Sequence, residues 1–449
     1  FDAITGESYY QTSSNGLSAT VFENIETKQR YLAVRGTELG AADIVADAIL
    51  AAGFPQYVNP QFVVLRDKVL DWMTSGILPA AFSAAGHSLG GYLAAAVGSF
   101  FRRGPVYMYN APGVGGAVGN AFDALKSALG LGNVPLVSDI YNFRGSEGIS
   151  IITGLGAQLA PPTLIQIEAA VGGALGPGNH SVVRLVDAFS VYSLYSQLSP
   201  ALSLDQIGTL LKSSADESQL TLENALDALR ILLLGKQAVE DKPTLEGSTD
   251  SRESLYANLY ALQESAAYKS LKGSAALRLP AERSRDELAS GAKRDFGTFL
   301  AVKYLLPVAV EGAGSAIREA HADLYAQWQA DRALAAAPRE GEEPTYSEEY
   351  LADRAAFLTW KLKLAVEDFD MTKGAYAKAG VDAYFHDLGS KLQINLGSQS
   401  TLPADKPRYI FGADQKDGIT ETLSGGSQSD RMYGGGGNDV LYGYDGAEY

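Results

Sequence analysis

The sequence contains no cysteine, which excludes disulfide bonds and thiolate chemistry. No run of about 20 uninterrupted apolar residues occurs, and this argues against a membrane-spanning helix. Basic runs are also missing, and the net charge of -16 argues against nucleic acid as a partner. Histidine is scarce, with four residues in the chain, so a reaction that needs an imidazole base has few candidates.

Apolar residues are plentiful enough for a large core. They make up 46% of the 449 residues, and this length predicts two or three domains. The chain starts at Phe1 without a methionine or a cleavable signal sequence, and it stops within a repeat that is described below. We therefore expect a piece of a longer protein.

The most informative stretch is residues 86–91, which read Gly-His-Ser-Leu-Gly-Gly and fit the pattern Gly-x-Ser-x-Gly. In such a nucleophile elbow a strand turns sharply into a helix, and the serine, here Ser88, exposes its hydroxyl at the apex. Small apolar residues at 81–85 predict the strand, and alanine-rich residues at 92–97 predict the helix. This context favours a nucleophile over a serine in an ordinary glycine-rich turn.

The elements around this stretch predict an α/β fold with a parallel sheet, because strands alternate with helical patterns. Residues 17–22 and 30–34 predict a hairpin, and residues 62–73 predict a helix. Residues 136–143 predict a later strand. Residues 149–175 are apolar and almost uncharged, so they either line a groove or lid beside the site or form a buried helix.

A serine nucleophile needs a base, usually histidine, and an acid that orients it. His87 is too close to Ser88 along the chain to fold back as its base. His321 is expected on a helix surface, and His386 lies far downstream. His180 follows a glycine-rich loop and precedes a helix, which fits the chain order serine, acid, histidine. Its alternative role is that of a neighbour of a helix N-cap.

The acid is expected at the C-terminal end of the strand that precedes the histidine. Glu147 is the first carboxylate after that strand, and we prefer it. Asp139 lies nearer the start of the strand and is expected to point away from the site. Asp187 lies in the helix after His180. The alternative interpretation of Glu147 is a solvated loop glutamate.

Three motifs together resemble the class 3 lipase family of α/β-hydrolases: Arg-Gly-Thr at 35–37, residues 86–91, and Asn-His-Ser at 179–181. The similarity covers roughly residues 1–200. It implies an oxyanion hole formed by Thr37 and the backbone N–H of Leu89. The family usually has Asp-x-Val where this sequence has Glu147-Gly148-Ile149.

The middle of the chain, residues 201–395, has a different composition. Strand signals vanish, and charged patterns with helical spacing replace them. We expect a helical domain of five to seven helices without a catalytic motif. Whether it covers the active site, supports the tail or binds a partner stays open.

The tail repeats with a period of nine from residue 425 onward. Residues 434–442 read Gly-Gly-Gly-Gly-Asn-Asp-Val-Leu-Tyr, which fits the repeat of calcium-binding RTX proteins. The preceding unit has Gln428 where the pattern has glycine, and the following unit has Tyr444. Asp414 and Asp417 are candidates for a decayed earlier repeat. The tail is thus expected to begin a parallel β-roll.

Calcium is the expected cofactor of this tail, because the repeat presents carboxylates and glycine carbonyls to a hard cation. The alternative is a flexible glycine-rich tail. So few turns predict weak calcium binding or some empty sites. The predicted ligands are Asp430, Asp439, Gly435, Gly437 and Glu448.

The sequence therefore predicts an α/β-hydrolase domain over residues 1–200, a helical domain over 201–395 and truncated RTX repeats over 396–449. The resemblance implies a secreted bacterial serine esterase, with a triacylglycerol lipase preferred. Its partners would be a lipid or ester substrate at an interface and the type I secretion machinery. The alternatives are a phospholipase A1, a polyester-cleaving esterase, and a calcium-dependent RTX adhesin or toxin module with little ester hydrolysis.

Overall fold

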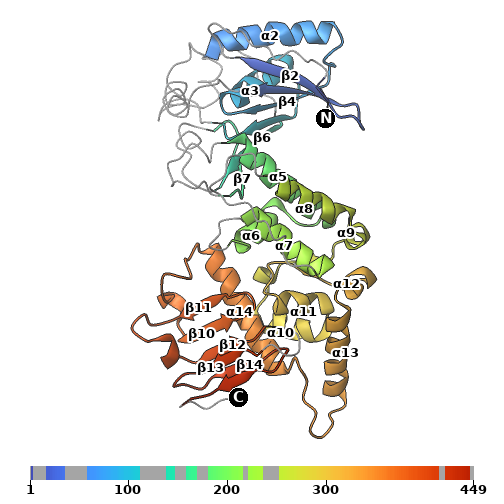
Figure 1. Cartoon of the computed structure of the whole chain (residues 1–449). Coiled ribbons are helices and arrows are strands. Elements are labelled where there is room, and N and C mark those ends of the chain that lie inside the picture. The colour runs from blue at the N-terminus through green and yellow to red at the C-terminus, as the bar shows by residue number, and fades with distance from the viewer. Residues whose placement is uncertain are drawn as a thin grey trace. The chain divides into compact units, whose positions relative to one another are not determined.

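The computed structural model describes residues 2–3, 17–35, 58–111, 138–146, 158–168, 181–215, 221–235, 252–413 and 420–444. The chain divides into two compact units, Phe1–Ser190 and Val191–Tyr449. Figure 1 shows the elements of both units, and each unit is described by itself. None of the described helices is long and apolar enough to cross a membrane. The three-domain division stays a prediction.

The first unit is built on a seven-stranded sheet in the order β1-β2-β3-β4-β5-β6-β7. The pairs β1–β2 and β2–β3 are antiparallel, and β3 to β7 run parallel. The predicted hairpin and parallel sheet are therefore confirmed. The strands are β1 (Asp2–Ala3), β2 (Ser18–Glu23), β3 (Arg30–Arg35), β4 (Ser83–His87), β5 (Val106–Tyr109), β6 (Ile140–Gly145) and β7 (Pro162–Ile165).

Helices pack on the sheet of this unit (Figure 1). α3 (Leu89–Phe101) is buried from Gly90 to Ser99, because its many glycine and alanine residues let the helix lie close against the strands. α2 (Val58–Thr74) packs against α3 in the same core. Phe189 of α5 (Val182–Leu198) meets the rings of Tyr109 and Phe143 edge-on, with centroids 5.8 and 5.4 Å apart.

The edge strand β7 shows which secondary structure part of the apolar stretch after β6 adopts. Residues 162–165 pair with β6 as a parallel strand, so this part of the stretch is not helical. Leu164, in this strand, is 54% exposed. Most of the remaining residues of the stretch lie outside the described ranges.

The second unit begins with helices. Nine α-helices occur between residues 204 and 366 of the described chain, more than the five to seven expected, because α9 and α12 are too short to show helical periodicity. Short strands β8 (Leu277–Arg278) and β9 (Ala309–Val310) lie between them. The helices are α6 (Leu204–Ser213), α7 (Thr221–Leu234), α8 (Glu253–Glu264), α9 (Ala266–Leu271), α10 (Arg285–Arg294), α11 (Phe296–Lys303), α12 (Ser315–Ala320), α13 (Ala322–Ala336) and α14 (Glu348–Val366).

The C-terminal strands form the start of a parallel β-roll, which confirms the pairing expected for the tail. One sheet has the order β11-β10-β12-β14, and β13 pairs with β15 in a second sheet. Ile410 pairs with Met432 and Leu423 with Leu441, so successive strands alternate between the two sheets. The strands are β10 (Ala383–Asp387), β11 (Gln393–Leu396), β12 (Arg408–Phe411), β13 (Thr422–Ser424), β14 (Arg431–Tyr433) and β15 (Val440–Tyr442).

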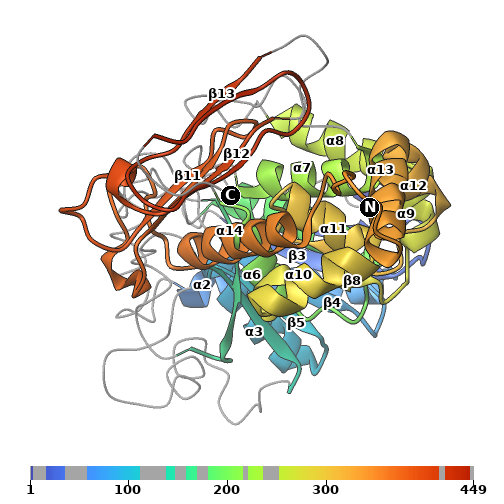
Figure 2. The ribbon, with the colours of Figure 1, turned by 90° about the horizontal axis from the view of Figure 1, so that it is seen from below.

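Figure 2 views these strands from another direction, with α14 running beside them and next to α10 and α11. Leu423 is fully buried between the sheets with Tyr384 and Ile410. The repeat therefore places its apolar residue inside the roll. Leu441, in the last described strand, is 48% exposed.

Candidate functional site

Ser88 stands at the junction of β4 and α3. Its backbone has φ 54° and ψ -130°, a left-handed conformation that side chains rarely adopt. The Ser88 N–H donates to Tyr109 O at 3.0 Å, and Ser88 O accepts from the Gly91 N–H at 2.9 Å. Its side chain makes no capping hydrogen bond to α3. The strained turn thus holds the hydroxyl away from the helix backbone.

The glycines of the elbow are required by close backbone contact. A Cβ atom on Gly86 would lie 2.0 Å from Gly90 O and 2.7 Å from Gly91 N. A Cβ atom on Gly91 would lie 2.9 Å from the Cβ of Ala111. These distances are too short for carbon, so the turn accepts only glycine at Gly86 and strongly favours it at Gly91. The geometry of this turn therefore explains Gly86, the first glycine of the pattern Gly-x-Ser-x-Gly, and also Gly91, which directly follows the pattern.

Leu89 is the first residue of α3, and its N–H belongs to the helix end that carries partial positive charge. A developing oxyanion beside Ser88 would meet this N–H. The second predicted donor, Thr37, lies outside the described residues. Burial raises the pKa of nearby Tyr109 to about 12, with a smaller contribution from Tyr107, so Tyr109 stays neutral and cannot act as the base.

The parallel strands bring their carboxyl ends to one edge of the sheet. Ser88 follows β4, and Asn110, which is buried, follows β5. Asn110 Oδ1 accepts from the Gly145 N–H at 3.0 Å, and Asn110 N–H donates to Phe143 O at 2.9 Å. Asn110 therefore ties the end of β5 to the end of β6. The only local signal for this role is the position of an asparagine at a strand end.

The predicted acid and base lie outside the described residues, as do most residues of their loops. Glu147 follows Ser146, the last described residue after β6, and His180 precedes Ser181, the first described residue before α5. Asp139 is exposed and precedes β6, at the opposite edge of the sheet from Ser88. Asp187 is buried within α5.

The placement of His321 corrects an expectation. It was expected on a helix surface, but it is buried with 6% exposure at the junction of α12 and α13. Its Nε2 lies 2.9 Å from Ile231 O and 3.2 Å from Leu232 O at the end of α7. Desolvation lowers the His321 pKa, so the ring is neutral near pH 7 and serves as a structural cap.

The acids of the tail occupy equivalent places in successive repeats. Asp430 is fully buried, and its carboxylate accepts the backbone N–H groups of Arg408 and Gly426. Asp439, one repeat later, accepts the Glu421 N–H at 3.1 Å. Glu421 lies nine residues before Asp430, so it marks the earlier repeat acid that the sequence analysis missed. Asp414 and Asp417 lie outside the described residues.

The glycines of the repeat leave room for these acids. A Cβ atom on Gly425 would lie 2.7 Å from Asp430 Oδ2, and one on Gly434 would lie 2.8 Å from Asp439 Oδ2. Gly435 has φ 82° and Gly437 has φ 116°. Tight turns that carry aspartates and glycine carbonyls fit the ligand preference of calcium. Among the described residues, no group of three or more histidine or carboxylate side chains is placed to hold a metal ion. Glu448 lies outside the described residues.

Comparisons with known proteins agree with this description of the tail. Residues 418–447 match the family model of the RTX calcium-binding nonapeptide repeat (4 copies). These nonapeptide repeats bind calcium, which confirms the predicted cofactor and the suspected RTX tail.

Among solved structures the chain is similar to Lip2 lipase from Yarrowia lipolytica, at 18% identity and a TM-score of 0.24. The similarity covers 39% of this chain and 73% of that one. A TM-score this low supports no statement about activity. No curated protein matches the chain.

Proposed function

We propose that this protein is a serine carboxylic-ester hydrolase with an α/β-hydrolase fold, most closely a triacylglycerol lipase. The observation that carries the proposal is the backbone of Ser88, held at φ 54° between β4 and α3. A strained serine at the carboxyl end of a central parallel strand is the position from which a nucleophile reaches a bound ester.

The reaction follows from the roles of the residues around Ser88. Ser88 Oγ attacks the ester carbonyl while His180 takes its proton. The imidazolium of His180 then protonates the leaving alcohol, and water releases the acid from the acyl-enzyme by the reverse sequence. The Leu89 N–H and Thr37 hold the oxyanion, at about 3–4 kcal/mol for each donor. Glu147 orients the imidazole.

The choice of Glu147 as the acid is supported by its place directly after the end of β6. Asn110 and Gln166 anchor this end, since Asn110 accepts from Gly145 N–H and Ser146 Oγ donates to Gln166 Oε1 at 3.1 Å. Glu147→Gln should lower kcat by about 10³-fold or more. Asp139→Asn should leave kcat unchanged because Asp139 precedes the strand. If Asp187→Asn lowers kcat and Glu147→Gln does not, Asp187 is the acid.

The tail would hold calcium through the carboxylates of Asp430 and Asp439 and the carbonyls of Gly435 and Gly437, with Glu448 in the next unit. Calcium there would bring adjacent turns of the roll together and carries no step of the ester chemistry. RTX repeats are typical of exported bacterial proteins, so we propose secretion through the type I machinery. A lipid surface would then be the natural place of action.

The test is hydrolysis of p-nitrophenyl esters from short to long acyl chains, with wild type beside Ser88→Ala. Wild type should cleave long-chain esters, and Ser88→Ala should lose at least 10³-fold in kcat. Fatty acid released from phosphatidylcholine would instead indicate a phospholipase A1. If wild type cleaves no ester with or without calcium, the proposal fails and the binding-module alternative takes its place.

A further inference from the structure

Lys406 is fully buried in the second unit, in the segment that leads into β12. It follows the short 3-10 helix η6 (Pro403–Asp405). Lys406 Nζ donates to Asn395 Oδ1 at 2.7 Å. It also donates to the carbonyl oxygens of Leu396 and Ser398, at 2.8 Å each. The lysine therefore ties the end of β11 to the segment before β12.

These three hydrogen bonds require the charged form of the lysine. An ammonium group has three N–H donors, one for each oxygen. A neutral amine has two donors, and its lone pair would face the third oxygen. Burial lowers the pKa of Lys406, and the negative charge of Asp382 partly offsets this effect. Because the three acceptors are uncharged oxygens, the ammonium is a buried cation held by the kind of ligand that calcium also takes.

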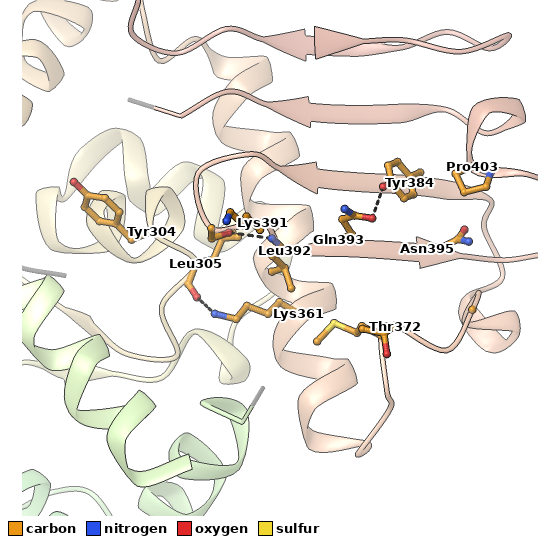
Figure 3. A pocket seen from close by; sticks show the side chains of 13 residues that line it. Tyr304, Leu305, Lys361, Thr372, Tyr384, Lys391, Leu392, Gln393, Asn395 and Pro403 are labelled. Atoms are coloured by element: carbon orange, nitrogen blue, oxygen red, sulfur yellow. Dashed lines mark hydrogen bonds between the residues drawn. The ribbon is translucent and has the colours of Figure 1, made fainter. Parts of the chain in front are cut away.

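The turn after β11 is held by contacts that do not involve the lysine. Gly397 has φ 90°, and a Cβ atom there would lie 2.0 Å from Asp382 Oδ1, so glycine is required. The same carboxylate oxygen accepts the Ser398 N–H at 2.7 Å. Figure 3 shows Asn395 on β11 and Pro403, the first residue of η6, in the lining of one cavity. The turn thus keeps its own shape and presents its oxygens to the ammonium.

The segment that carries Lys406 also holds the first nonapeptide turn, which ends at Asp430. Ala404 O accepts the Ser427 N–H at 2.8 Å. At the other end of the segment, the Arg408 N–H donates to Asp430 Oδ1 at 2.8 Å. The segment therefore supports the first turn as an earlier repeat supports a later one.

We propose that Lys406 is a built-in cation of the β-roll, which fixes the segment beside the first nonapeptide turn without calcium. Its ammonium joins two segments through oxygen atoms, as calcium would between later turns. The strands β10, β11 and β12 then stay folded in the absence of calcium, and the dependence on calcium begins at the first nonapeptide turn. The proposal rests on the calcium-binding repeats and is independent of ester hydrolysis.

The first test is hydrogen exchange of the full chain, followed by mass spectrometry, in a chelator and in calcium. Calcium should slow amide exchange roughly tenfold or more in β14 and β15, which belong to the repeats. In β10, β11 and β12 it should change exchange by less than about twofold. Equal slowing in β12 and β14, or no slowing in either strand, would overturn the proposal.

The second test is the same measurement on Lys406→Met, which keeps the length of the side chain and removes the ammonium. The three oxygens then lose their donors, so β12 should exchange roughly tenfold faster than in wild type when both are in the chelator. If β12 of Lys406→Met stays as protected as in wild type, an apolar side chain serves equally well and the proposal is wrong.

The third test is rescue of Lys406→Ala by n-propylammonium, which supplies the missing part of the side chain. In the chelator the variant should have a Tm lower by roughly 4 °C or more. Propylammonium should restore most of this loss. Neutral n-propanol, and tetramethylammonium without N–H donors, should not restore it at the same ionic strength.

Lys378→Ala is the matched control, because Lys378 is exposed. Its Tm should stay within about 1 °C of wild type and should not respond to propylammonium. The proposal fails if Lys406→Ala melts like wild type, or if n-propanol restores its Tm as well as propylammonium does.

Discussion

Ser88 occupies a backbone region that costs a residue with a side chain about 1–3 kcal/mol. Its neighbours hold it there. Ser88 N–H donates to Tyr109 O, and the elbow closes through the contact between Gly86 and Gly90. The residue is therefore positioned by backbone packing rather than by side-chain contacts. Changes that separate these backbones should affect stability and activity together.

Gly86→Ala is the most direct such change. Its Cβ would lie 2.0 Å from Gly90 O, so the strand and helix must move apart. We expect a loss of about 2–4 kcal/mol in the free energy of unfolding. Chemical denaturation measures it. In the control Gly104→Ala the new Cβ meets nothing closer than 3.9 Å, and the change should stay within about 0.5 kcal/mol. Equal effects of both would contradict the packing account.

His321 should make stability depend on pH. Burial lowers its pKa in the folded protein below the ordinary value of about 6.5, so the unfolded chain binds the proton more readily. Its contribution to stability is present above pH 6.5 and is lost as pH falls below that value. His321→Gln keeps an N–H donor for the α7 carbonyls without titrating.

We expect denaturation curves of His321→Gln to lose less stability between pH 7 and 5 than wild type. Some dependence should persist, because burial also lowers the pKa of His386. If the free energy of unfolding changes with pH equally in His321→Gln and in wild type, His321 does not titrate in this range. His386→Gln provides the matched comparison.

At the scale of elements, α14 is tied to the calcium-binding roll. Arg431 Nη1 donates to Asp353 Oδ1 and Oδ2 at 3.0 and 2.9 Å. The Tyr433 hydroxyl donates to Asp353 Oδ2 at 2.6 Å. Burial, and then the bond to Asp353, raise the pKa of Tyr433 above its usual range, so it remains a donor. Both partners stand in β14, directly after Asp430.

Asp353→Asn should weaken this connection. The amide has one acceptor oxygen and no charge, and its NH₂ group would face the donors of Arg431 and Tyr433. We expect a loss of about 1–2 kcal/mol in the free energy of unfolding. In the control Asp286→Asn, the carboxylate is 84% exposed and pairs with Arg285, so the change should be near zero. A negligible effect of Asp353→Asn would contradict the connection.

The elements around Ser88 and the repeat period could be predicted from sequence because their signals are local. Small apolar residues, adjacent glycines and a nine-residue period each lie within a short window. The burial of His321 depends on carbonyls of Ile231 and Leu232, about 90 positions away, and its own window is polar. Likewise Asp353 meets Arg431 across 78 positions. The periodicity of apolar residues in a sequence does not indicate contacts between side chains so far apart in the chain.

The residues of the catalytic site also fall into those with a local sequence signal and those without one. Ser88 was recognisable because it lies in a Gly-x-Ser-x-Gly pattern, whose first glycine, Gly86, is required by close contact with the backbone of Gly90. Asp139 could be placed at the edge of the sheet opposite Ser88 because it precedes β6, whereas Ser88 follows β4. Glu147, His180 and Thr37 stay predictions outside the described residues. Asn110 was missed because its contact with Gly145 becomes visible only when β5 and β6 pair.

For the whole molecule, calcium should stabilise the folded chain, because the repeats at 418–447 bind it and the unfolded chain lacks adjacent turns. Added calcium should raise Tm relative to a chelator, and Asp439→Asn should reduce this rise. Asp323→Asn, on α13, should leave it intact. The same calcium response in wild type and Asp439→Asn would contradict the assigned ligand.

The central claim is that Ser88 is a nucleophile toward ester carbonyls. A p-nitrophenyl alkylphosphonate tests it most directly, because an activated serine displaces nitrophenolate and keeps the phosphonate as a stable adduct. We predict release of about one equivalent of nitrophenolate, with the adduct mapped by mass spectrometry to the peptide containing Ser88 and absent from Ser88→Ala. No adduct in folded wild type, or an equal adduct in Ser88→Ala, would contradict the account.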